Sequence, residues 1–120
     1  MAKSTNRYFQ FTGSSKKAQV SPGLWYPAAD VYQTPDGWVV KVELAGVSLE
    51  EINIEVKGNT LYIAGSRKDR SCAAGVSYQQ MEITYSNFEK TLRFPVLLEG
   101  AKVEHIFENG LLIITLIKSS

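Results

Sequence analysis

Residues 106–117 read Ile-Phe-Glu-Asn-Gly-Leu-Leu-Ile-Ile-Thr-Leu-Ile, a tight turn followed by an apolar run. Asn109-Gly110 is a strong turn signal, because both residue types tolerate a positive φ. Residues 111–117 are apolar except for Thr115 and mostly branched, which favours a short buried strand over a helix. Because polar alternation is missing, we expect both faces of this strand to meet apolar surface. The simplest partner is a second sheet, so we predict a central strand in a β-sandwich.

Other short strands are predicted on the N-terminal side of this turn. Residues 38–44 alternate, with Trp38, Val40, Val42 and Leu44 on one face. Residues 51–57 and 60–64 flank Gly58-Asn59 and form the best hairpin signal of the chain. Weaker strand patterns occupy residues 29–34, 78–84, 88–94 and 102–107. About eight short strands without a long helix indicate an all-β, antiparallel sandwich.

Length and composition fit one soluble domain with a modest core. The net charge of +1 gives no electrostatic reason to expect nucleic acid or a membrane surface as partner. Cys72 is the only cysteine, which excludes an intrachain disulfide. The first residues lack the apolar segment of a secretory signal, and no apolar run has the length of a membrane span. A cytoplasmic location is the default expectation.

Residues 1–24 are rich in Lys, Ser, Thr, Gln and Gly, which is typical of a flexible arm. The folded domain is expected to span residues 25–118, beginning at Trp25-Tyr26-Pro27. Within the arm, Tyr8, Phe9 and Phe11 stand out. They are either chance aromatics in a disordered tail or a mobile contact for partner proteins.

The residue types needed for catalysis or metal binding do not form a recognisable pattern. His105 is the only histidine and lies in a strand-like segment, which favours a structural or surface role. One histidine and one distant cysteine do not make a metal site, and the acidic residues lack calcium-loop spacing. We therefore expect no enzyme activity, no cofactor and no metal. A small enzyme or a sugar-binding sandwich remains the least favoured alternative.

Residues 65–87 are long for a connection in a compact sandwich, and they contain a strand-like piece. Connections of that length are usually functional. An exposed strand-like segment can pair with the edge of another chain, which favours a role in dimerisation.

Several short motifs occur in a characteristic order. They are Pro27-Ala28-Ala29-Asp30-Val31-Tyr32, Glu43-Leu44-Ala45-Gly46-Val47, Leu61-Tyr62-Ile63-Ala64-Gly65-Ser66-Arg67, then Glu82, Tyr85, Phe88 and Pro95, and finally Asn109-Gly110-Leu111-Leu112. Together they resemble the α-crystallin domain of the small heat-shock proteins, from Trp25 to Lys118. The order and spacing carry this resemblance, since each motif alone is weak.

The chain also departs from the pattern of that family. Ala45 stands in place of a Pro, Ser86 in place of a Gly and Ile117 in place of a Pro, while His105 falls where a small Ala is common. Lys90 stands in place of an Arg, and a Lys cannot make the planar bidentate contact of a guanidinium. Compared with that family, we expect residues 119–120 to be a truncated end, since the given sequence stops at Ser120 before an Ile-x-Ile/Val tail. We expect this end to limit assembly to dimers or small oligomers.

The resemblance implies an immunoglobulin-like sandwich of seven to eight strands and an ATP-independent holdase that binds unfolding client proteins. It implies a dimer made by strand exchange, in which residues 78–83 pair near Val31 and Tyr32 of the other chain. The residues expected at that interface are Val31, Tyr32, Tyr78, Gln80, Met81, Glu82, Ile83 and Lys90. The residues expected to line or support an edge groove for a tail or client are Ile52, Ile54, Val56, Val103 and Ile106. Tyr8, Phe9 and Phe11 are the expected client contacts of the arm.

A second interpretation is a co-chaperone-like adaptor domain of the related CS type, which docks on one defined partner. That domain lacks a crossing strand. A monomer with residues 66–87 disordered would favour it.

Overall fold

A computed structural model describes residues 24–71 and 73–118, so the aromatic arm residues Tyr8, Phe9 and Phe11 lie outside the described residues. The described chain has seven strands and one short 3-10 helix. They are β1 (Ala29–Thr34), β2 (Gly37–Glu43), η3 (Leu49–Glu51), β3 (Ile52–Lys57), β4 (Thr60–Ser66), β5 (Asn87–Arg93), β6 (Lys102–Glu108) and β7 (Leu111–Ile117).

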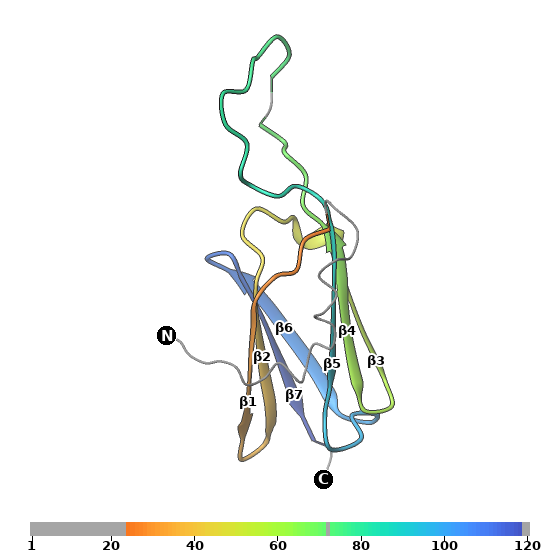
Figure 1. The fold of residues 1–120 in the computed structure, drawn as a ribbon. Helices are drawn as coiled ribbons and strands as arrows, with labels where there is room; N and C mark the ends of the chain where they lie inside the picture. The colour runs from red at the N-terminus through yellow and green to blue at the C-terminus, as the bar shows by residue number, and fades with distance from the viewer. Residues whose placement is uncertain (1–23, 72, 119–120) are drawn as a thin grey trace.

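The strands form two antiparallel sheets that stack face to face (Figure 1). One sheet has four strands in the order β1-β2-β7-β6, and the other has three in the order β3-β4-β5. The predicted all-β sandwich is confirmed, and β7 is a central strand as expected. The expectation for both faces of β7 was wrong in part. Leu112, Ile114 and Leu116 are buried, whereas the residues between them are only half-buried, because no second layer of described residues covers the outer face.

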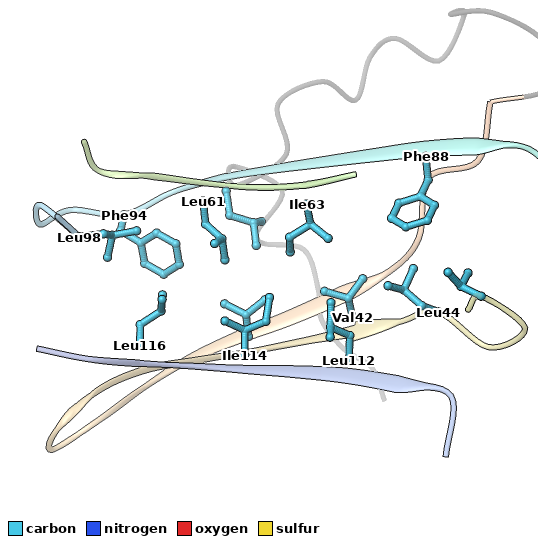
Figure 2. Close-up of a cluster of buried hydrophobic side chains, with 13 residues drawn as sticks. Val42, Leu44, Leu61, Ile63, Phe88, Phe94, Leu98, Leu112, Ile114 and Leu116 are labelled. Carbon is cyan, nitrogen blue, oxygen red and sulfur yellow. The ribbon is translucent and has the colours of Figure 1, made fainter. Parts of the chain in front are cut away.

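The core lies between the sheets and follows from the alternation of the strands. Every second residue of β2, β4, β5 and β7 points inward, as the two-residue period of a strand dictates. Figure 2 shows these side chains meeting from both layers. The buried hydrophobic residues that make up the core are Val40, Val42, Leu44, Val47, Leu61, Ile63, Phe88, Leu92, Phe94, Leu98, Leu112, Ile114 and Leu116. Burial of this apolar surface is what stabilises the fold.

Turn chemistry and one close approach fix the ends of the strands. Asn109 has a φ of 54° and Gly110 a φ of 78°, so the predicted turn before β7 is confirmed. Gly65 lies under the ring of Phe88, and an added Cβ would come within 2.8 Å of that ring and would also meet the Glu51 carbonyl. Residue 65 therefore has no room for a side chain. Between β2 and β3, the 3-10 helix η3 follows Ser48, whose side chain makes no capping hydrogen bond to the backbone of the helix.

Two connections determine which strand edges stay open. The segment before β1 covers β5, since Trp25 N donates to Asn87 O at 3.2 Å and Lys90 Nζ donates to Pro27 O at 2.8 Å. The connection from β5 to β6 crosses to the β3–β4 turn, where Leu98 N donates to Gly58 O at 2.9 Å. β1 therefore lies on the β5 side of the sandwich, and β6 lies on the β3 side.

Between β4 and β5 the chain leaves the sandwich as an excursion, residues 67–86, which projects beyond the end of both sheets (Figure 1). The strand predicted over residues 78–84 is not formed there, so that prediction was wrong for the single chain. Among the described residues, no strand of either sheet lies beside this segment to form a β-ladder with it. A strand pattern without a pairing partner stays irregular, because isolated strands are not stable in water.

Candidate partner-binding surfaces

The excursion exposes most of its large apolar side chains. Met81 and Ile83 are 69% and 63% exposed, and the other large apolar residues of the excursion that are exposed are Val76, Tyr78 and Tyr85. Gln80 and Glu82 are exposed as well, and Gln80 Nε2 donates to Glu82 Oε2 at 2.7 Å. Apolar groups gathered in this way on one projecting segment are typical of a protein-binding surface.

Polar contacts tie the base of the excursion to the sandwich. Glu51 forms ion pairs with Lys68 at 3.4 Å and with Arg70 at 2.8 Å. Higher up, Asp69 accepts hydrogen bonds from the backbone N–H of Ser71 and, at 3.0 Å, from the Tyr78 hydroxyl. These bonds, that of Ser71 first, hold the pKa of Asp69 below its usual value. Exposed contacts of this kind are weak, so they position the excursion without fixing it.

Arg67 is the strongest anchor of the excursion. Its Nε and Nη2 both donate to Thr84 O, at 2.9 and 2.7 Å, and its Nη1 donates to Ala45 O at 3.1 Å. Its Cζ lies 3.6 Å from the centroid of the Trp25 ring. The guanidinium thus joins the two roots of the excursion, the β2–η3 connection and the first described residues of the chain.

β1 is a free edge of the larger sheet, and edge strands can pair with another chain. Tyr32 lies on its outer face, 44% exposed, with Lys41 Nζ at 5.5 Å from the ring centroid. Val31 points inward and packs against the core. Lys90 lies nearby on β5 and points inward between Phe88 and Leu92, and burial lowers the pKa of its ammonium. The single chain does not bring residues 78–83 to this edge.

The opposite edge combines β3 and β6. Ile52, Ile54 and Val56 point inward, are half-buried, and pack against the core. On β6, Val103 faces inward opposite Leu116. Ile106 does not join these residues, because it pairs with Ile113 and lies on the outer face of the larger sheet, 53% exposed.

Phe107 is the residue that sequence reasoning missed at this edge. It pairs with Leu112, faces inward with Val103, and packs against the core. Residues 103, 105 and 107 share one face of a strand because they are two positions apart, and this spacing could have identified Phe107. Ile106 lies on the opposite face. His105 occupies the middle of this inward series and is exposed.

The described residues contain no group of three or more His, Cys, Asp or Glu side chains that could hold a metal ion. None of the helices in the described ranges, 24–71 and 73–118, is long and apolar enough to cross a membrane. What the arrangement provides is therefore surface for protein contacts: open edges at β1 and at β3–β6, and an exposed apolar excursion.

Residues 30–120 match the family model of the Hsp20/alpha crystallin family. The chain belongs to that family. It is 35% identical over 94 residues to the 16.9 kDa class I heat shock protein 1 of Triticum aestivum, covering 75% of this chain and 60% of the relative. It is 27% identical over 110 residues to small heat shock protein C2 of Rickettsia felis, covering 92% and 68%. Heat shock protein 16.0 from Schizosaccharomyces pombe superposes with a TM-score of 0.73 at 28% identity, covering 80% of this chain and 89% of that one.

Membership of this family confirms the α-crystallin sandwich expected from the motifs. Small heat-shock proteins are chaperones that use no ATP, and the chain is accordingly not an enzyme. The family match does not favour the CS-type adaptor. The chain spans 60% and 68% of the length of the two relatives named above. Two residues of the motif Leu-x-Ile-x-Gly-x-Arg have structural roles, although neither was predicted as a site residue. Residue 65 has no room for a side chain, and Arg67 holds Thr84 O.

Proposed function

We propose that this protein captures unfolding client proteins without ATP and prevents their aggregation. The observation that carries the proposal is the exposed apolar excursion on a well-packed sandwich. A holdase needs apolar surface that can be shown reversibly, and it needs no reactive group. Among the described residues, Met81 and Ile83 supply such surface at 69% and 63% exposure.

The working form would be a dimer made by strand exchange. In this arrangement residues 78–83 of one protomer pair with β1 of the other, beside Val31 and Tyr32. Two features support it: β1 is an edge strand of the larger sheet, and residues 78–83 have strand-forming side chains but belong to neither sheet formed by the described residues. Lys90, which holds the segment before β1 through Pro27 O, would keep that edge in place for the partner.

Two further contacts complete the proposal. The β3–β6 edge, with Ile52, Ile54, Val56 and Val103, would accept an Ile-x-Ile/Val segment or a client strand, because its inward apolar residues are only half-buried or exposed. Ile106 would take no part there, since it faces the other way. Tyr8, Phe9 and Phe11 would contact clients from the arm. The expected partners are unfolding proteins and further copies of this chain in the cytoplasm, without nucleic acid or membrane.

Light scattering of a heated model client, with and without the full chain, tests the holdase activity. We expect the full chain at an equimolar ratio to suppress the scattering. Unchanged client aggregation would refute the proposal, whatever the oligomeric state of the protein.

Multi-angle light scattering tests the dimer separately. We expect the mass of a dimer for the full chain, and the mass of a monomer for the double variant Met81→Asp/Ile83→Asp, because charges in residues 78–83 oppose burial in an interface. Val76→Asp is the matched control, since Val76 is 53% exposed in the same excursion but lies outside the pairing segment. Equal masses for the double variant and the unchanged chain would rule out pairing through residues 78–83.

A further inference from the structure

A hollow of about 260 Å³ opens at the end of the sandwich away from the excursion. Its floor is made by Trp38, Leu98 and Leu116, and the Trp38 ring rests edge-on against Phe94 with centroids 5.2 Å apart. Figure 2 places Phe94, Leu98 and Leu116 together at one end of the core, opposite Phe88 and Leu44. The hollow therefore lies over one end of the core and has an apolar floor.

The rim of this hollow displays apolar residues on a firmly held connection. Leu97 is 74% exposed and Val96 is 48% exposed. On either side of them, Phe94 N donates to Asn59 O at 2.8 Å and Leu98 N donates to Gly58 O at 2.9 Å. Because the backbone is hydrogen-bonded on both sides of Val96 and Leu97, the fold itself keeps these two side chains exposed, and their exposure does not depend on loop motion.

We propose that the Tyr8–Phe11 segment of the same chain docks into this hollow. The segment reads Tyr-Phe-Gln-Phe and is the only aromatic cluster in residues 1–24. In an extended conformation Phe9 and Phe11 lie on one face, about 7 Å apart. One ring then enters the hollow against Trp38 and the other covers Leu97, which buries the apolar rim.

Charge favours the arm as the occupant. Residues 1–24 carry four basic residues and no acidic residue. Residues 25–120 then carry nine basic and twelve acidic residues, a net charge of −3, so arm and body attract each other. The rim of the hollow contains Glu99 and Lys118. The Glu99 carboxylate has the charge needed to form an ion pair with Arg7, which directly precedes the aromatic segment.

The length of the arm allows the contact within one chain. Leu24 lies thirteen positions after Phe11, and a segment of that length spans up to about 43 Å when extended. The sandwich between Leu24 and the hollow is about as long as the seven residues of β4, or about 23 Å. A tether of this kind gives a high effective concentration, so even a weak apolar contact is populated. The docked aromatic residues are withheld from clients until the arm is displaced.

Disulfide trapping in the full chain tests this contact. In a Cys72→Ser background, Gly13→Cys, which lies on the same face as Phe9 and Phe11, is combined with Gln33→Cys, an exposed position at the rim of the hollow. The matched control combines Gly13→Cys with Thr91→Cys, an exposed position in the middle of β5 that the arm also reaches. We expect the intrachain disulfide of the rim pair to form about tenfold faster than that of the control, because docking raises the effective concentration.

Adding Phe9→Ser and Phe11→Ser to the rim pair is expected to bring its rate down to that of the control. Equal rates for the rim pair and the control would overturn the proposal, as would disulfides that form only between chains. Neither of these results affects the holdase activity or the dimer proposed above.

Discussion

Ile63 of β4 is 1% exposed and Leu112 of β7 is 0% exposed, whereas Met81 and Ile83 of the excursion leave 69% and 63% of their surface in solvent. The two regions use similar side chains, but only the sandwich offers them a second layer. In the sandwich, burial of apolar surface stabilises the fold. In the excursion, the same kind of surface stays available for another protein. One short chain thus keeps its stability and its binding surface in separate places.

The largest expected effect comes from truncating one residue in each region. Ile114→Ala is expected to lower the free energy of unfolding by about 3 kcal/mol, because it leaves a cavity in the core. Ile83→Ala is expected to change the free energy of unfolding of the monomer by less than about 0.5 kcal/mol, because Ile83 is exposed in the single chain. Urea unfolding of both variants at a protein concentration low enough to keep them monomeric measures the difference. Similar losses for the two variants would mean that the excursion is part of the cooperative fold.

A smaller effect is expected at the junction of the two regions. Arg67→Met keeps an apolar stem but removes the contacts to Trp25 and Thr84. These contacts contribute about 1–2 kcal/mol of local stability, so chymotrypsin is expected to cleave the excursion about tenfold faster. Arg70→Met is the control, because it loses only an ion pair between partly exposed groups and should change the rate less than about twofold. Equal cleavage rates for the two variants would show that Arg67 is not the main anchor of the excursion.

The smallest effect is a pH dependence inside the sandwich. Burial lowers the pKa of Lys90 from its usual value of 10.5, so the unfolded chain binds this proton more tightly than the folded chain. The stability of the unchanged protein is therefore expected to rise, relative to Lys90→Met, as the pH increases towards 10.5. The neutral amine can still donate to Pro27 O. Urea titrations between about pH 8 and 10 measure this difference, which would not change with pH if Lys90 were fully hydrated.

The sequence predicted the sandwich well, because alternation and turn residues act locally. β2, the β3–β4 hairpin and β7 follow directly from such patterns. Residues 78–84 were predicted as a strand from their composition, but a strand also needs a neighbour, and composition does not provide one. The outer face of β7 was misjudged for the same reason, since only the topology decides which faces receive a second layer.

The candidate surfaces were harder to predict than the fold. Ile106 was grouped with Val103 at one edge groove, although the parity of residues 103 and 107 in the sequence places Ile106 on the other face of β6. The role of Arg67 depends on contacts with segments far away in the chain, which no local pattern contains. The same is true of the end hollow, whose lining comes from the β1–β2 turn, the β5–β6 connection and the end of β7.

Arg67 has a mechanical consequence for the whole molecule. Its guanidinium lies on the Trp25 ring while its Nε and Nη2 hold Thr84 O. A pull on the residues before Trp25 is thus transmitted through one side chain to the far root of the excursion. Force applied to the first described residues would therefore reach the excursion through Arg67, and force applied to the excursion would reach Trp25 in the same way.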